Sequence, residues 1–307
     1  MGDEGEKRAQ GVTGGVRLID IHAHCVRDAE VRIKGFRAVP TPDELLRIYD
    51  RLGVEKGVIL PLATGESVGT QSNEEVLYIC RAHPDRFVPF CNIDPRNDYN
   101  GTHQPMRTYL EEYIGRGCKG LGLLCANLPV NDPQVTNLVA AAEALDLPVI
   151  ARFTAFRDRS YGLVDTRGLA DLDLLAERFP RLRLLCHGRT FWCEISAYSG
   201  RQPRLSLPSG TVKGGRLAEL LRKRGNIMCD LSADCGANAI MRDRAYGARF
   251  LTEFRNRVLF GLDADAVAGE PPLAAHLRSL VDAGELGEDV FADVMRGNAA
   301  RLLGGNA

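Results

Sequence analysis

The sequence predicts an α/β protein, specifically a (β/α)8 barrel. Eight short apolar runs of strand type alternate with longer helical patterns, and most of these runs are almost continuously apolar, as parallel strands covered on both faces are. The 307 residues also match the length that α/β barrels use as one domain. The predicted strands are Arg17–His22, Lys56–Pro61, Phe87–Ile93, Cys118–Leu124, Leu147–Arg152, Leu182–His187, Asn226–Leu231 and Val258–Leu262.

Helices are predicted between these strands from their start signals and their apolar periodicity. The run from Thr41 to Glu44 matches a capping box with proline at the first helical position, and Asp132-Pro133 opens an alanine-rich helix. An open doubly wound sheet is the alternative fold, but no glycine-rich phosphate-binding motif follows the first strand. Helices are expected to start at Thr41 and Ser72 and to cover Gln104–Gly115, Gln134–Leu145, Gly168–Phe179, Gly215–Arg224, Arg244–Phe254, Pro272–Asp282, Glu288–Arg296 and Asn298–Leu303.

Composition excludes several classes of partner. The net charge is −1 and the basic residues are scattered among acidic ones, which argues against a nucleic-acid or membrane-surface partner. No apolar run approaches the roughly 20 residues of a transmembrane helix, and the polar N-terminus lacks the apolar core of a signal peptide. The nine cysteines include no C-x-x-C and are typical of buried thiols in a reducing compartment. A cytoplasmic protein with a small-molecule substrate is therefore expected.

We predict a disordered leader over residues 1–15, followed by a single barrel domain over residues 16–307. The connection from Gly188 to Gly214 is unusually long and carries the only tryptophan, Trp192. Long connections without secondary structure often form lids over active sites. A lid is therefore expected over residues 188–214, with a plain surface excursion as the alternative.

Polar side chains are placed at the ends of the predicted strands, where the active sites of such barrels lie. His22 and His24 stand two residues apart at the end of the first strand, so their side chains point to the same side. His187 ends the sixth strand, Asp230 lies in the seventh and Asp263 ends the eighth. Neutral imidazole is the commonest ligand of zinc and similar divalent metals. The pattern indicates a metal centre, whereas H-x-H alone could be two unrelated histidines.

Several short stretches, spread over nearly the whole chain from about Arg17, carry a family resemblance. They are Asp20–His24, Leu185–Gly188, Leu259–Asp263 and Arg296–Leu303, together with Pro84–Phe87 and Met228–Ser232. In combination they resemble the amidohydrolase superfamily. The branch they resemble is the amidohydrolase-related one, which contains aminocarboxymuconate-semialdehyde decarboxylase and related aromatic-acid decarboxylases and hydrolases.

By this resemblance, His22 and His24 bind one divalent metal, usually zinc. Asp263 ligates the metal or exchanges protons with its water, and His187 polarises the substrate or joins the metal ligands. A zinc ion lowers the pKa of bound water to roughly 7, and a nearby carboxylate can take the proton. The expected function is hydrolysis of a small, anionic, cyclic or aromatic substrate by metal-activated water, with non-oxidative decarboxylation as the alternative. Relatives often dimerise, so a homo-oligomer is expected as well.

Arg152 departs from the family pattern, because the family's fifth strand normally ends in a metal-binding histidine. A guanidinium stays protonated and has no lone pair to offer a metal. In the first interpretation, the metal persists on His22, His24 and Asp263, with or without His187. Arg152 then grips a carboxylate or phosphate of the substrate.

Two other interpretations of this strand remain open. In one, the metal is lost, Arg152 pairs with Asp263, and the protein is a non-catalytic descendant. In the other, the register of the strand is misjudged and a residue such as Cys125 completes the metal site. Hydrolysis and decarboxylation use the same polar residues, so the sequence does not separate these two reactions.

Overall fold

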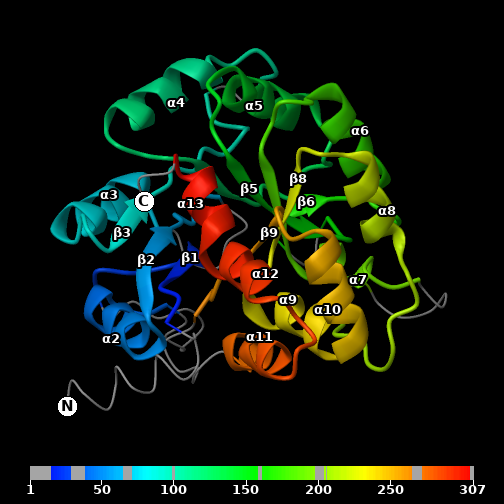
Figure 1. The fold of residues 1–307 in the computed structure, drawn as a ribbon. Coiled ribbons are helices and arrows are strands. Elements are labelled where there is room, and N and C mark those ends of the chain that lie inside the picture. Colours follow the sequence, from blue (N-terminus) through cyan, green and yellow to red (C-terminus); the bar gives the residue numbers. More distant parts are fainter. Residues whose placement is uncertain are drawn as a thin grey trace. The chain divides into compact units, whose positions relative to one another are not determined.

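The structure is a computed structural model that describes residues 15–28, 39–64, 71–98, 101–157, 161–197, 204, 206–264 and 272–304. The chain divides into two compact units. Figure 1 shows the order of the helices and strands along the chain. The first comprises Met1–Ile59, Tyr78–Val88 and Asp230–Ala307, and the second comprises Leu60–Leu77 and Pro89–Cys229. The single domain over residues 16–307 stays a prediction. The predicted leader lies outside the described residues except for Gly15.

Parallel strands run through the first unit. β1 (Leu18–Ala23) pairs in parallel with β2 (Val54–Ile59), and β3 (Phe87–Pro89) follows β2 in the sheet. On the other side of β1, the Ile21 N–H donates to the carbonyl of Phe260, directly after β9 (Val258–Leu259). All of β1 is buried, so its polar side chains need partners inside the protein.

Apart from α9, the helices of the first unit begin close to where the sequence signals them. α2 (Pro42–Leu52) has the predicted capping box, in which the Thr41 N–H donates to Glu44 Oε2 at 2.9 Å. α3 (Asn73–Ala82) begins one residue after Ser72 and runs from the second unit into the first. The others are α9 (Ala233–Met241), α10 (Arg244–Glu253), α11 (Pro272–Asp282), α12 (Glu288–Ala292), a π-helical turn (Asp293–Gly297) and α13 (Asn298–Leu302).

The helix α9, which directly follows the seventh predicted strand, is absent from the sequence prediction. Gly236 and Asn238 lower its intrinsic helix propensity, so the local pattern does not indicate a helix. Gly236 is required by a close approach, because a Cβ there would lie 2.2 Å from the carbonyl oxygen of Leu231. Packing against the end of the preceding strand therefore outweighs local propensity.

The second unit contains parallel strands in the order β4 (Leu121–Leu124), β5 (Val149–Thr154), β7 (Leu184–His187) and β8 (Ile227–Asp230), the last residue of β8 belonging to the first unit. Strands of this unit again alternate with helices, which confirms the α/β class. These helices are α4 (Met106–Gly115), α5 (Pro133–Ala144), α6 (Ala170–Arg178), α7 (Arg189–Cys193) and α8 (Arg216–Lys223).

Two features of this unit differ from the predicted elements. β5 continues two residues beyond Arg152, and a short strand, β6 (Leu163–Val164), pairs with that extension. The helix α7 occupies the start of the predicted lid segment, which is therefore not wholly irregular. Residues 198–203 and 205 of that segment lie outside the described residues.

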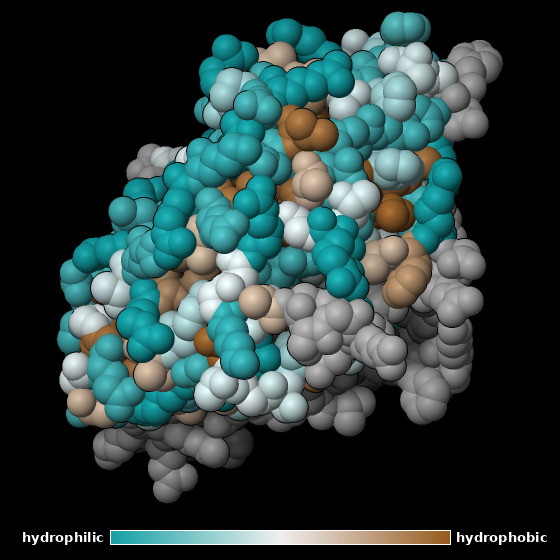
Figure 2. Space-filling model, turned by 90° about the vertical axis from the view of Figure 1, so that its right-hand side faces the viewer, coloured by the Kyte–Doolittle hydropathy of each residue, from teal (hydrophilic) through white to brown (hydrophobic). Residues whose placement is uncertain are grey.

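Hydrophilic residues predominate on the face shown in Figure 2, and the hydrophobic areas there are small and separate. Four large hydrophobic side chains stand out as exposed in the described chain, namely Tyr78, Phe156, Leu174 and Leu207. Scattered single residues of this kind are normal on a globular surface. Within the described ranges, no helix has both the length and the hydrophobicity needed to cross a membrane.

A buried arginine anchors the connection from Gly188 to Gly214. Arg204 is 8 % exposed, and its guanidinium donates to the carbonyls of Asp165 at 2.8 Å and Thr166 at 3.1 Å. Its Nε lies 3.3 Å from the Glu194 carboxylate, which is also buried. Burial and the nearby Asp171 carboxylate raise the pKa of Asp165 to about 7, although Arg204 acts against that rise.

Asp165→Asn is expected to reduce the loss of stability at high pH. Folded Asp165 keeps its proton up to about pH 7, whereas the unfolded chain loses it near the ordinary value of 3.8. The folded state therefore binds more protons between these values, so the free energy of unfolding falls as the pH rises through this window. Denaturant unfolding at both pH values should show that, from pH 5 to pH 8, the free energy of unfolding falls by about 2–3 kcal/mol less in the variant than in the unmodified protein. The exposed Asp146→Asn serves as control, and an equally reduced fall in that variant would contradict the prediction.

Candidate metal centre

The end of β1 brings two imidazole rings together. His22 and His24 are both buried, and their rings lie edge to face with centroids 5.2 Å apart. Their Nε2 atoms approach to 3.3 Å. The two side chains therefore project to the same side, as their spacing in the sequence predicts. A hydrogen bond of 2.8 Å from the Asp263 N–H to the His22 carbonyl ties this strand end to the segment after β9.

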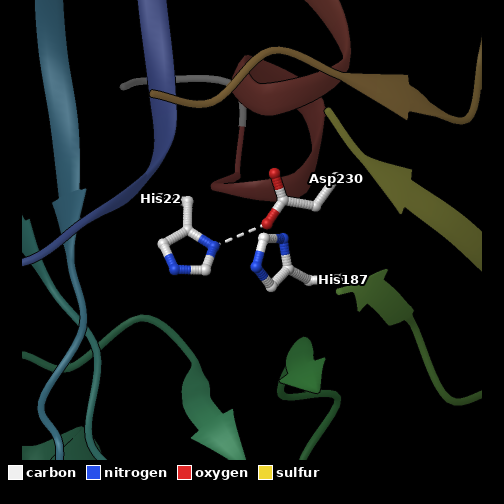
Figure 3. A group of neighbouring side chains, drawn as sticks. All are labelled: His22, His187 and Asp230. Atoms are coloured by element: carbon white, nitrogen blue, oxygen red, sulfur yellow. Dashed lines mark hydrogen bonds and ion pairs between the residues drawn. The ribbon is translucent and has the colours of Figure 1, made fainter. Parts of the chain in front are cut away.

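Asp230, the last residue of β8, determines which nitrogen of His22 carries the proton. The Nδ1–H of His22 donates to Asp230 Oδ2 at 2.6 Å, and both side chains are fully buried (Figure 3). The second oxygen of Asp230 accepts from the Ser232 N–H at 2.9 Å. A carboxylate on Nδ1 leaves the lone pair of a neutral imidazole on Nε2, which is the arrangement found behind metal-binding histidines. The sequence placed Asp230 at a strand end, but this partnership required the structure.

Asp263 supplies the third candidate ligand. Its Oδ1 lies 3.8 Å from His22 Nε2 and 3.9 Å from His24 Nε2, and its side chain is 26 % exposed. Atoms bound tetrahedrally at about 2.1 Å to one zinc ion lie roughly 3.4 Å apart. The three separations of 3.3, 3.8 and 3.9 Å are therefore close to what one shared cation requires. Two imidazoles and one carboxylate also form a donor set that suits zinc and related divalent metals.

The carboxylates around His22 increase its affinity for protons. Burial alone would lower the pKa of His22, but the charges of Asp230 and Asp263 outweigh burial and raise the pKa above its usual value. The same negative charges attract a divalent cation. Protons and a cation therefore compete for this imidazole, and metal binding should weaken at acidic pH.

A second buried carboxylate lies behind the histidines. Asp20 accepts hydrogen bonds from the His22 N–H at 3.0 Å, the Leu262 N–H at 2.9 Å and the Tyr49 hydroxyl at 2.8 Å. Burial raises the pKa of Asp20 to about 7, against the effect of these hydrogen bonds. Asp20 therefore joins the backbone of β1 to that of the segment after β9. Its place in the Asp20–His24 motif was the only sequence signal for this role.

The second unit holds the other two predicted site residues, His187 and Arg152. His187, also labelled in Figure 3, ends β7 and is fully buried. Arg152 is its register partner on β5, and Arg152 Nη1 donates to His187 Nε2 at 3.1 Å. This bond uses the Nε2 lone pair, so in this state Nε2 is not available to a metal. That His187 binds a metal stays a prediction.

Two alternatives for the fifth strand stay predictions, because Arg152 and Cys125 belong to the second unit whereas His22, His24 and Asp263 belong to the first. Cys125 is buried, and its Sγ lies 3.4 Å from Thr64 Oγ1.

Comparisons with known proteins show the family of this chain. The model of the amidohydrolase family, Amidohydro_2, matches residues 19–305. Among curated proteins, none matches the sequence. The structure is similar to the probable 2-pyrone-4,6-dicarboxylic acid hydrolase of Acinetobacter baumannii, solved with citric acid bound. That likeness has a TM-score of 0.59 at 14 % identity and covers 94 % of this chain and 99 % of the other.

Two decarboxylases have a similar fold. The 2,6-dihydroxybenzoate decarboxylase from Rhizobium has a TM-score of 0.57 at 17 % identity, over 94 % of this chain and 99 % of the other. The 5-carboxyvanillate decarboxylase of Novosphingobium aromaticivorans, complexed with manganese and 4-hydroxy-3-methoxy-5-nitrobenzoic acid, has a TM-score of 0.57 at 12 % identity, over 94 % and 96 %. These findings confirm the predicted fold class and family. The chain belongs to the amidohydrolase family and is an enzyme of the amidohydrolase type with a (β/α)8 barrel fold.

Proposed function

We propose that this enzyme is a metal-dependent hydrolase of a small, anionic, cyclic or aromatic substrate. The observation that carries the proposal is the approach of three ligand atoms, His22 Nε2, His24 Nε2 and Asp263 Oδ1, within 3.9 Å of one another. The hydrogen bond from His22 Nδ1–H to Asp230 supports it, because it keeps the ligating nitrogen unprotonated.

In this proposal, His22, His24 and Asp263 hold one divalent cation, with zinc favoured by the two nitrogen donors. Such a cation acidifies water and polarises the oxygen atoms of a substrate. Asp263 is the partly exposed member of the group, so its carboxylate can accept the proton of the attacking water and return it to the leaving group. The buried Asp230 acts through His22, by holding the ring in position.

His187 and Arg152 are proposed to act on the substrate. Both lie toward the C-terminal ends of parallel strands, the part of a (β/α)8 barrel that supplies its active-site residues. Neutral His187 and cationic Arg152 offer hydrogen-bond donors to developing negative charge. Neither role needs a nucleic-acid or membrane partner.

Decarboxylation is the second candidate, supported by the two decarboxylases with similar folds. The same cation site would orient polar groups of the substrate, and Asp263 or His187 would deliver a proton to the carbon that loses CO2. Reaction in 18O-labelled water distinguishes the two candidates. Hydrolysis places the label in the organic product, whereas decarboxylation leaves the organic product unlabelled and releases CO2.

The purified protein is expected to carry close to one divalent cation per chain after dialysis against zinc or manganese. Elemental analysis should show loss of this cation in His22→Ala, because two of the three ligands cannot retain it tightly. His103→Ala, at an exposed position, is the matched control and should keep the cation. Absence of bound metal in the unmodified protein, or equal metal in both variants, would refute the proposed metal site.

A further inference from the structure

Tyr49 is a buried polar side chain that the proposed chemistry does not use. It lies on α2, is fully buried, and its hydroxyl donates a hydrogen bond of 2.8 Å to Asp20 Oδ2. Burial and the negative charge of Asp20 raise the pKa of Tyr49 above its usual value, so the hydroxyl keeps its proton and remains a donor. Its partner is therefore the carboxylate that lies behind the histidines of the metal centre.

Glycine at position 57 determines where the Tyr49 ring can lie. Gly57 on β2 is the register partner of Asp20 on β1, and a Cβ at Gly57 would overlap with the Tyr49 hydroxyl and the end of its ring. The Phe87 ring packs edge to face against Tyr49, with centroids 6.1 Å apart. Because β2 has no side chain at this position, the hydroxyl of a residue on α2 can reach Asp20 on β1.

Asp20 connects Tyr49 to two segments of the metal centre. Its Oδ1 accepts from the N–H groups of His22 and Leu262, whereas its Oδ2 accepts from the Tyr49 hydroxyl. The next N–H along the chain, that of Asp263, donates to the His22 carbonyl at 2.8 Å. Rotation of the carboxylate would break its bonds to the backbone, and the hydrogen bond from Tyr49 opposes that rotation.

The backbone of Asp263 depends on this support. Its φ is 46°, in the left-handed region that residues other than glycine rarely occupy. Such a conformation persists only where the surrounding structure holds it. The hydrogen bonds from the Leu262 and Asp263 N–H groups supply that hold. They keep Asp263 Oδ1 within 3.9 Å of the Nε2 atoms of His22 and His24.

We infer that Tyr49 is a positioning residue of the metal centre, whose hydroxyl acts through Asp20 to keep His22 and Asp263 in ligating positions. The inference rests on the proposed function, because these two residues are proposed ligands. Without the hydroxyl, the carboxylate can rotate, and the two segments then hold the ligand atoms in a wider range of positions. Ligands that are less well ordered before binding pay more entropy when they bind, so the affinity for a cation falls.

Chelator competition with zinc at pH 8 tests this inference, because Asp20, with a pKa of about 7, is mainly ionised there. Tyr49→Phe removes only the hydroxyl and should lower the zinc affinity about 10-fold, as expected for a group behind a metal ligand. Gly57→Ala keeps the hydroxyl but displaces it, so it should lower the zinc affinity as well. Circular dichroism checks the folding of both variants, and if one does not fold, the other decides the question.

Hydrogen–deuterium exchange of the metal-free protein gives a second readout, which needs no bound cation. Peptides that contain His22 or Leu262 should exchange faster in Tyr49→Phe than in the unmodified protein, because the carboxylate that accepts from these N–H groups is less firmly held. A purely structural role of Tyr49 would instead increase exchange throughout the first unit.

Two control variants accompany Tyr49→Phe. Tyr109→Phe removes a hydroxyl that donates to Asp98 Oδ2 at 2.7 Å, which is the same chemical change in the second unit. Leu280→Ala removes buried methyl groups from α11 and lowers the stability without removing a hydrogen bond to Asp20. Both controls should bind zinc as tightly as the unmodified protein.

Unmodified zinc affinity in Tyr49→Phe would overturn the inference. A weaker affinity with unchanged exchange at His22 and Leu262 would also overturn it, because Tyr49 would then not act through Asp20. An equal loss of affinity in Leu280→Ala would overturn it by showing that lower stability is the cause.

The same measurements separate this inference from the proposed function. Absence of zinc binding by the unmodified protein refutes the metal site and the inference together. Zinc that is lost in His22→Ala but bound with unmodified affinity in Tyr49→Phe refutes only the inference.

Discussion

Asp230→Asn is expected to lower the affinity for zinc or manganese about 10- to 100-fold, although only one oxygen atom is exchanged for nitrogen. The amide oxygen of the variant stays with the Ser232 N–H, because an amide NH2 there would place two donors against each other. The NH2 group then faces His22 Nδ1 and donates to it. His22 must carry its proton on Nε2, and the lone pair needed for the cation is lost.

Competition with a chromogenic chelator at several pH values measures this effect. The unmodified enzyme should bind metal more tightly as the pH rises, because the carboxylates of Asp230 and Asp263 raise the pKa of His22 and its proton must leave first. Asp85→Asn makes the same chemical change at an exposed position of the first unit and should leave affinity and pH profile unchanged. An Asp230→Asn variant with unmodified metal affinity would show that His22 does not ligate through Nε2.

Gly261→Ala is expected to destabilise the fold and the metal centre together. A Cβ at Gly261 would lie 2.8 Å from Asp230 Oδ1, 2.8 Å from Ser232 Cβ and 3.2 Å from His22 Cβ. All of these positions are buried, so the added methyl group must displace its neighbours. Overpacking of this kind typically costs about 1–3 kcal/mol. The Asp230 carboxylate, once displaced, also holds the His22 ring less firmly, so the affinity for the metal should fall.

Chemical denaturation and chelator competition, on the same preparation, check both parts of this prediction. Gly225→Ala is the matched control, because no atom lies within 4 Å of a Cβ built there. That control should change neither the stability nor the metal affinity by a measurable amount. Loss of stability with unmodified metal affinity would mean that the histidines do not depend on this close packing.

Much of the architecture could be predicted from local chemistry. Three local signals each indicate an element that is present, namely the apolar run before His22, the capping box at Thr41 and the helix start at Asp132-Pro133. Apolar periodicity, capping hydrogen bonds and the backbone geometry of proline all act within a few residues of the chain. The helix α9 and the short strand β6 were missed, and β9 is three residues shorter than the predicted strand Val258–Leu262, because contacts outside the local pattern decide these elements. In α9, Gly236 permits a close approach to the carbonyl oxygen of Leu231 that helix propensity does not register.

By itself, the sequence determined the fold class, the family resemblance and the two histidines, because strand periodicity places side chains two residues apart on one side. Only the tertiary structure decided what each polar atom does. Asp230, which holds the Nδ1 proton of His22, is 208 residues away from it, and Arg152 donates to His187, which is 35 residues away. Buried hydrogen bonds between such residues carry no local sequence signal, because their partners meet only when strands from separate parts of the chain lie side by side.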